Sequence, residues 1–415
     1  MTGFEVDKER LSLLNIQNPI KTERTEEDYI EMLTSYFIST TNDSYLRMTR
    51  GDISKEEFLK MVTGYLDKIA KDKSKVFKEN ILNQFEKELW GFGVLEELID
   101  DSPNDEETIS DIKVVTFDNV RIKKNGKRMD GGVKFSSEKA FWRFVRSIAA
   151  RNGQNLSMLN AKKTFTDTMS NKDWILRFSI VTEFINSTAA GQPALHIRKL
   201  PKKHKSLSYY ESRGKLVTKE QMAYFKKRIE DGYGFLIIGK TGAGKTIFFN
   251  GLLDYVPRDK SVLCVQEYEE LNNACDDADY VPHPEMLFFH TVSASGEGKV
   301  EYDLKDISQI GLTFDIDYFA LGETKGAEAK YLLNYIKTGS IGMASGHGSS
   351  IEDGMDKIAD YITYESSYTK AEALAELQRL NTVVFIKDFR VQDVAEVTGY
   401  DREKQTLIYN HVELS

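Results

Sequence analysis

The chain has little cysteine and no long apolar run. Its 415 residues include two cysteines, Cys264 and Cys275, and neither stands in the short spacing of a metal-binding motif. This excludes a disulfide scaffold, and we expect both thiols to be reduced and either buried or incidental. No apolar stretch approaches the roughly 18 residues that a membrane-spanning helix needs. The first residues also lack the basic-then-apolar pattern of a signal peptide, so we expect a cytoplasmic protein.

The chain also lacks an excess of basic residues. Its 56 Lys and Arg against 65 Asp and Glu give a net charge of −9, which argues against a surface built to bind nucleic acid. A hydrophobic content of 40% is ordinary for a globular protein. A chain of 415 residues is too long for a single core, so we expect two or three domains.

The most informative feature present is a run of glycine, lysine and threonine typical of a phosphate-binding loop. Its residues follow the spacing G-x-x-x-x-G-K-[ST] and are Gly239, Lys240, Thr241, Gly242, Ala243, Gly244, Lys245 and Thr246. Glycines let the backbone curl so that several N–H groups face one anion. In such a loop Lys245 reaches the β- and γ-phosphates, and the Thr246 hydroxyl ligates Mg²⁺. A buried strand predicted at 233–238 and a helix at 246–253 argue against a chance match.

The rest of the chain shows three kinds of pattern. Apolar residues at helical spacing predict a helical region over residues 1–100. Alternating patterns, with one helix capped by Ser136 or Ser137, predict a small α+β domain over 101–200. Its strands are expected at 109–115, 120–123, 174–181 and 194–198. Residues 216–415 begin with a capping box, Thr218 with Gln221, and then alternate strand and helix, which predicts a parallel sheet.

A basic run around Pro201 occupies residues 198–205, and we place a basic linker or hinge at 201–215. Two interpretations stay open. The run is a solvated linker, or Arg198 or Lys199 faces a nucleotide or an acidic lipid surface.

Polar residues follow three of the predicted strands in the second half. They are Glu267 after 261–265, Glu323 after 317–321, and His347 after 341–346. Ligands of open parallel sheets bind beyond the carboxyl ends of the strands. We therefore expect these side chains to surround the phosphate loop.

This combination resembles the secretion and traffic ATPases, the motors of type IV secretion and conjugation, type II secretion, and type IV and Flp pili. Members of that family carry a phosphate loop, an acidic box, a third box that begins Gly-Glu, and a fourth box that ends in His. Here the third box reads Gly-Glu-Thr-Lys-Gly-Ala-Glu-Ala at 322–329, and the fourth, at 338–347, ends in His347. The likeness spans roughly residues 90–400 and is closest to the conjugation and Flp-type branch. It implies a RecA-like phosphate-loop ATPase domain of the α/β class, preceded by a helical region and a small PAS-like α+β domain.

The resemblance also implies roles for the site residues. Lys245 holds the phosphates, Thr246 and, through water, Glu267 hold Mg²⁺, Glu323 polarises the attacking water, and His347 senses the γ-phosphate. The alternatives are that Glu323 is a solvent charge at a strand end and His347 a turn histidine. Glu269 and Glu270 are expected at the surface.

Some positions depart from the family pattern. Gln266 replaces one carboxylate of the acidic box, Gln309 and Thr313 stand where arginines are usual, and Lys325 stands where Arg is common. Lysine cannot make the bidentate phosphate contacts of arginine. Hydrolysis is therefore expected to be slow, or the charge is neutralised by Arg198, Lys305 or Lys325.

The resemblance implies a cytoplasmic ATPase ring, a homohexamer that binds ATP and Mg²⁺ and works on a membrane-embedded secretion or pilus platform protein, with peripheral membrane association. A second interpretation is a nucleotide-gated assembly protein with little turnover. A nucleic-acid motor is the weakest, because no basic-aromatic stripe is present. The sequence leaves open whether the machine moves DNA, protein or pilin.

Overall fold

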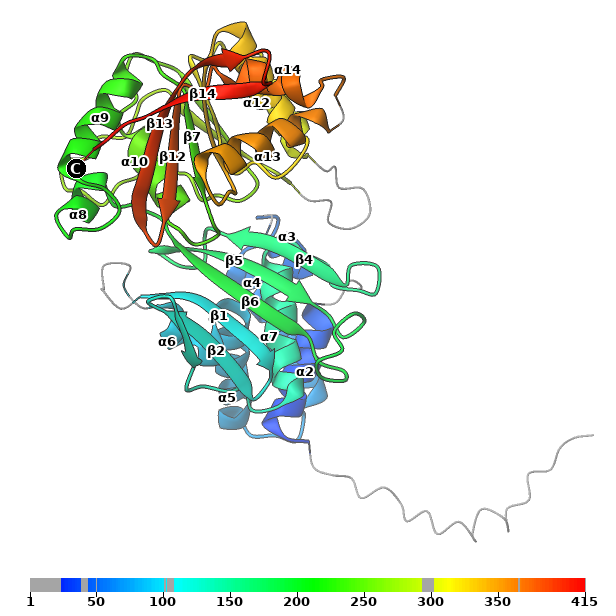
Figure 1. Cartoon of the computed structure of the whole chain (residues 1–415). Coiled ribbons are helices and arrows are strands. Elements are labelled where there is room, and N and C mark those ends of the chain that lie inside the picture. The colour runs from blue at the N-terminus through cyan, green and yellow to red at the C-terminus, as the bar shows by residue number, and fades with distance from the viewer. Residues whose placement is uncertain are drawn as a thin grey trace, which may run out of the picture.

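The structure is a computed structural model that describes residues 24–38, 44–49, 51–100, 102, 108–292, 302–364 and 366–414. Two sheets dominate it: a six-stranded sheet from the first half and an eight-stranded sheet from the second (Figure 1). Among the described residues, no helix has both the length and the apolar character needed to cross a membrane.

Helices form the described part of the predicted helical region, whereas residues 1–23 of that prediction lie outside the described residues. They are α2 (Glu26–Phe37), α3 (Ser44–Thr49), α4 (Lys55–Ile69), α5 (Lys75–Trp90), the 3₁₀ turn η1 (Gly93–Leu95) and α6 (Glu96–Ile99). Thr25 and Ser54 form capping boxes at the starts of α2 and α4, which satisfies backbone N–H groups there. Apolar side chains at helical spacing, among them Phe37, Phe58 and Phe85, are buried together in one core.

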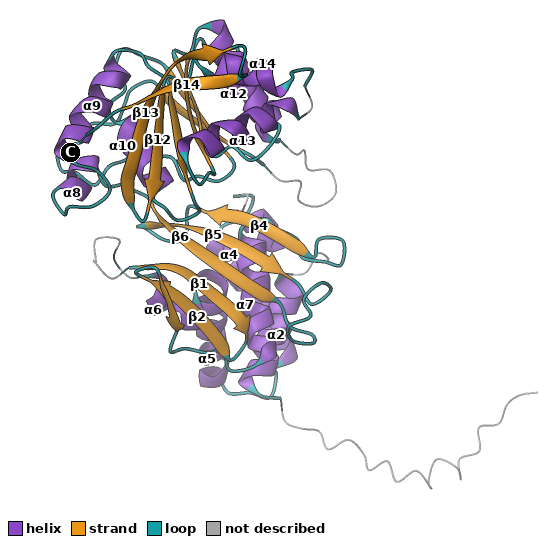
Figure 2. Ribbon diagram, viewed as in Figure 1, coloured by secondary structure: helices purple, strands orange, loops and turns teal. Residues whose placement is uncertain are grey.

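The six-stranded sheet is antiparallel throughout, with the order β3-β2-β1-β6-β5-β4. Its strands are β1 (Ile109–Thr116), β2 (Asn119–Lys124), β3 (Lys127–Asp130), β4 (Lys162–Asp167), β5 (Trp174–Val181) and β6 (Ala194–Pro201). Helix α7 (Glu138–Arg151), capped by Ser137, and the N-terminal helices gather on one face of it (Figure 2). The buried Arg143 of α7 ties them together through Glu27, Glu31 and Glu88.

The eight-stranded sheet has the order β14-β13-β12-β7-β11-β10-β8-β9. The six strands from β12 to β9 run parallel, and β13 and β14 add an antiparallel edge. The strands are β7 (Phe235–Gly239), β8 (Val262–Gln266), β9 (Met286–His290), β10 (Tyr318–Leu321), β11 (Ile341–Gly346), β12 (Thr382–Lys387), β13 (Arg390–Asp401) and β14 (Thr406–His411).

Helices cover both faces of this sheet and create two separate cores. One face carries α8 (Leu207–Glu211), α9 (Lys219–Glu230) and α10 (Lys245–Leu253). The other carries α11 (Leu304–Gly311), α12 (Ala329–Thr338), α13 (Ile351–Thr363) and α14 (Lys370–Leu377), and Figure 1 shows the sheet between the two sets. This confirms the predicted fold class, a RecA-like α/β unit preceded by a helical region and a small α+β unit. The boundaries of independently folding domains stay a prediction.

The basic run at 198–205 differs from the solvated linker considered above. Lys199 is buried beneath the six-stranded sheet, where its ammonium contacts the Leu98 carbonyl at 3.0 Å and lies over the Trp174 ring. Burial lowers the pKa of this lysine to about 7. His204 is buried as well. The reason is alternation: β6 turns successive side chains to opposite faces, so Arg198 and Lys199 cannot share a role.

Candidate nucleotide-binding site

The phosphate loop, residues 239–246, links the buried strand β7 to α10. Gly239 has no room for a side chain, because an added Cβ would lie 2.4 Å from the Ile386 carbonyl oxygen. Gly242 and Gly244 have φ of +79° and +104°, values that favour glycine. The loop therefore wraps the N-terminus of α10, where free N–H groups and the helix dipole attract an anion.

Lys245 is the buried cation of this loop. Its ammonium contacts the Gly239 carbonyl at 2.9 Å, the Lys240 carbonyl at 3.2 Å and His347 Nδ1 at 3.4 Å. Burial is the main cause that lowers the pKa of this lysine, although Glu323 and Glu270 oppose it. A phosphate group would supply the negative charge that this buried ammonium favours, so the loop fits a nucleotide.

Glu323 and His347 are brought together at the ends of adjacent parallel strands. Their side chains meet at 2.6 Å, between Glu323 Oε1 and His347 Nε2. Ser345 fixes this edge, because its hydroxyl donates to the Gly322 carbonyl and its own carbonyl accepts from the Thr324 N–H. Burial raises the pKa of Glu323, but Lys325 and His347 outweigh it and lower the pKa overall, so the side chain is a carboxylate at neutral pH.

Lys325 bridges two carboxylates of the site. Its ammonium lies 2.8 Å from both Glu267 Oε2 and Glu323 Oε2. Burial opposes the charge, but the two carboxylates raise the pKa of Lys325. In this conformation Glu323 is therefore held by a lysine on one oxygen and by a histidine on the other.

A further carboxylate, Glu270, reaches the site where surface exposure was expected. Gln266 is buried, and its side-chain oxygen accepts from the backbone N–H groups of Glu270 and Leu271 at 2.9 and 2.7 Å. This turns the segment back on itself and directs Glu270 Oε2 to 3.2 Å from the Thr246 hydroxyl. Gln266 stands where the family has a carboxylate, but two acidic residues, Glu267 and Glu270, still lie at this strand end. Glu269 is also engaged, since it accepts from the Thr166 hydroxyl at 2.6 Å.

A row of polar residues on the six-stranded sheet faces the loop. Register places Thr166, Arg177, Arg198 and Asp111 side by side on β4, β5, β6 and β1. Arg177 Nη1 contacts Glu270 Oε1 at 2.7 Å, and its guanidinium lies over the Tyr268 ring. Arg198 Nε contacts Asp111 Oδ1 at 3.1 Å.

Two directly opposed arginines repel each other, and sheets ordinarily avoid like charges in this position. Arg177 and Arg198 both line the cavity that holds Lys245, so an anion placed there would relieve the repulsion. Asp111 holds Arg198 in place. Burial raises the pKa of Asp111, but hydrogen bonds from His196 and Ser110 and the charge of Arg198 lower it well below its usual value.

The cavity between the two sheets has a volume of about 330 Å³. Of the predicted residues, Arg198, Thr241, Gly242, Lys245, Thr246, Glu267, Glu323, Lys325 and His347 line it. Lys240 and Ala243 border a neighbouring hollow between the loop and β12. Lys305 is an exposed residue of α11 and is not part of the cavity wall. The Thr246 hydroxyl beside the Glu270 carboxylate offers the hard oxygen donors that Mg²⁺ takes.

Comparison with known proteins identifies the family. Residues 99–382 match the family described as Type II/IV secretion system protein. The chain belongs to this family. The match begins at the last residue of α6 and ends at the first residue of β12. It therefore contains the phosphate loop, all three polar strand ends and both arginines. It confirms the family resemblance drawn from the motifs.

Individual relatives are distant. The chain is 24% identical over 264 residues to a Mycobacterium tuberculosis protein named "Putative conjugal transfer protein", covering 63% of this chain and 70% of that one. It is 22% identical over 415 residues to an uncharacterized protein of Methanocaldococcus jannaschii, covering 96% and 69%.

Solved structures of low identity are also similar. The VirB11 ATPase of the Brucella suis type IV secretion system is 17% identical, with 80% of this chain and 96% of that chain covered and a TM-score of 0.34. The pilus retraction motor PilT with bound ADP is 14% identical, with 74% and 80% covered and a TM-score of 0.48.

Sequence reasoning missed Arg177 and Glu270. Arg177 occupies an ordinary outward position of an alternating strand, and only the pairing of β5 with β6 shows that it lies beside Arg198. Glu270 is four residues beyond the strand end, and only the turn made by Gln266 returns it to the loop. One signal in the sequence was Gln266, because the side-chain amide of a glutamine at a strand end can accept hydrogen bonds from the backbone of the turn that follows.

Proposed function

We propose that the protein is an ATPase that binds ATP and Mg²⁺ between its two sheets and converts hydrolysis into movement of one sheet relative to the other. The observation that carries this proposal is the pair Arg177 and Arg198 on the six-stranded sheet, which faces the phosphate loop of the eight-stranded sheet across one cavity. Phosphoryl transfer depends on positioning and charge neutralisation, and these residues can supply both.

The residues divide the chemistry between them. Lys245 and the backbone N–H groups of the loop hold the phosphates. Glu323 orients and polarises the attacking water, while His347, which touches both Glu323 and Lys245, couples the state of the loop to the carboxylate. Mg²⁺, when bound, would neutralise phosphate charge, and Thr246 with Glu270 or Glu267 would hold it. Arg177 and Arg198 take the place of the family arginines replaced by Gln309 and Thr313.

From the family, we further propose that the protein forms a homohexameric ring. The ring would lie in the cytoplasm at the inner face of the membrane and would drive a membrane-embedded conjugation, secretion or pilus machine. The "conjugal transfer" name of the relative supports the conjugation branch. Light scattering with and without a non-hydrolysable ATP analogue tests assembly: a strict monomer in both conditions would remove the ring from the proposal.

The contact of Lys325 with both Glu267 and Glu323 favours a second candidate, a nucleotide-gated assembly protein with little turnover. A lysine in contact with Glu323 weakens its basicity, because the ammonium stabilises the carboxylate. The experiment that separates the two is ATP turnover of the wild type against Lys245→Ala. Turnover clearly above this variant supports the motor, and ATP binding with turnover equal to the variant supports the gated protein.

A further inference from the structure

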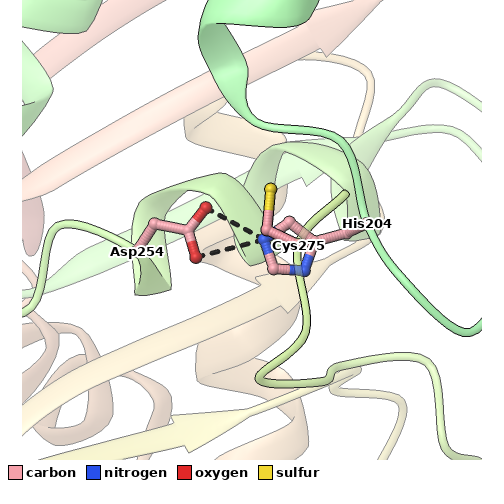
Figure 3. A group of neighbouring side chains, drawn as sticks. All are labelled: His204, Asp254 and Cys275. Carbon is pink, nitrogen blue, oxygen red and sulfur yellow. Dashed lines mark hydrogen bonds and ion pairs between the residues drawn. The ribbon is translucent and has the colours of Figure 1, made fainter. Parts of the chain in front are cut away.

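Three side chains from distant parts of the chain converge at the start of the 201–215 segment. They are His204, Asp254 directly after α10, and Cys275 in the loop after β8 (Figure 3). One donor atom of each residue lies within 4.8 Å of the donors of the other two. His204 and Cys275 are buried, and Asp254 is partly buried.

From this geometry we propose a binding site for a divalent transition-metal ion of the zinc class, with His204 Nε2, a carboxylate oxygen of Asp254 and the sulfur of Cys275 as ligands. Imidazole, carboxylate and thiolate together are a donor set typical of Zn²⁺. The site is separate from the phosphate loop, although α10 connects the two.

The backbone holds the ligands in register. His204 and Cys275 form a parallel bridge, in which the His204 N–H donates to the Ala274 carbonyl at 2.8 Å and the Asp276 N–H donates to the His204 carbonyl at 2.9 Å. These main-chain hydrogen bonds hold the two residues side by side, and Asn272 and Asp254 hold the His204 ring. A site of this kind needs little rearrangement to receive an ion.

The second nitrogen of the imidazole has the partner that metal-bound histidines ordinarily have. His204 Nδ1 lies 3.1 Å from Asn272 Oδ1, which also accepts from the Ala274 N–H. An oxygen at Nδ1 keeps the proton on that nitrogen, so Nε2, which lies 2.9 Å from Asp254 Oδ2, is the nitrogen that would give up its proton and bind the ion. Outer partners of this type orient a ligand and raise its basicity.

Small movements would bring the three donors to the distances of a tetrahedral ion. Ligands about 2.0–2.3 Å from zinc stand roughly 3.3–3.8 Å from one another. His204 Nε2 is 2.9 Å from Asp254 Oδ2, so this pair would separate slightly and the sulfur would approach. Binding would release the thiol proton and any proton on Nε2 to solvent.

An ion here would join the segment that follows β6 to the end of α10, whose other end is the phosphate loop. It would therefore restrain the connection between the two sheets.

The test uses the full chain without nucleotide, titrated with Co²⁺ as a spectroscopic probe and then with Zn²⁺. The proposal expects one equivalent of Co²⁺ with a thiolate-to-cobalt charge-transfer band, displaced by Zn²⁺. Cys275→Ser should remove the band and weaken Zn²⁺ binding about 100-fold or more, and Asn272→Ala should keep the band with binding about 10- to 100-fold weaker. The absence of a thiolate band in the wild type would overturn the proposal.

Cys264→Ala is the matched control, because it removes the only other thiol of the chain. A band retained in this variant assigns the sulfur to Cys275 even if Cys275→Ser fails to fold. A band lost from folded Cys264→Ala would contradict the assignment. Ions at the phosphate loop cannot produce the signal, since no thiol lines that cavity.

Discussion

The two sheets contribute to the nucleotide cavity in different ways. In the eight-stranded sheet, β7, β8 and β10 are buried along their whole length, and the polar groups of the site stand at or just beyond their carboxyl ends. In the six-stranded sheet, one face packs on helices and the other presents its polar groups in mid-strand, where Arg177 and Arg198 stand opposite each other. Fully covered parallel strands leave only their ends for chemistry, whereas an antiparallel sheet covered on one face keeps the other available.

This difference assigns distinct tasks to the two sides. In the proposed function, the eight-stranded side carries the loop, the carboxylate that would polarise water and the residues that would hold Mg²⁺. The six-stranded side would add positive charge from a separate sheet. Substitutions on the first side should therefore abolish the chemistry, and those on the second should weaken it.

The largest effect is expected for Lys245→Ala. Removing the buried ammonium from the phosphates should lower ATP turnover at least about 1,000-fold and strongly weaken nucleotide binding. The measurement is phosphate release by purified protein, with the exposed Lys226→Ala of α9 as a matched control. Normal turnover in folded Lys245→Ala would remove the phosphate-loop assignment.

Glu323→Gln should keep ATP binding and lower turnover about 100- to 10,000-fold, because the amide retains the shape but cannot polarise water. Nucleotide binding by calorimetry, beside turnover, separates the two steps. Glu403→Gln, in an exposed turn, is the control. Normal hydrolysis in Glu323→Gln would transfer the role to Glu267.

The two sheets also differ in how much of the site can be predicted from the sequence. Strand ends could be predicted, because a phosphate loop and three polar residues after apolar strands must meet at one edge of a parallel sheet. Helix starts such as Ser137 and Thr218 could also be predicted, because helix capping depends on residues close together in the sequence. Arg198 was a candidate because of the basic run, but Arg177 and its pairing with Arg198 were not predicted, because an arginine in an alternating strand looks the same whether it faces water or a ligand. The His204, Asp254 and Cys275 group was not either, because its members are distant in the chain and show no motif spacing.

A smaller effect is expected on the six-stranded side. Arg177→Ala and Arg198→Ala should each lower turnover about 10- to 100-fold, the value of one hydrogen bond to a charged group. Arg121→Ala is the matched control, an exposed arginine of the same sheet paired with Asp130. If both variants match this control, the six-stranded sheet takes no part in catalysis.

The smallest effect is expected for Asp111→Asn, and it should depend on pH. The folded pKa of Asp111 is lowered, so its carboxylate stabilises the fold above the unfolded value of about 3.9, and this stabilisation is lost as pH falls below it. At neutral pH the variant should lose about 1–2 kcal/mol of unfolding free energy. Urea unfolding at neutral and acidic pH measures this: a deficit that does not shrink in acid would contradict the account.

The most direct test of the central claim is a structure of the wild-type protein with Mg²⁺ and a non-hydrolysable ATP analogue. The account predicts that the β- and γ-phosphates lie on residues 239–246 and that the guanidinium groups of Arg177 and Arg198 donate hydrogen bonds to them, with Asp111 still holding Arg198. Phosphates bound to the loop with both guanidinium groups out of hydrogen-bond reach would contradict it.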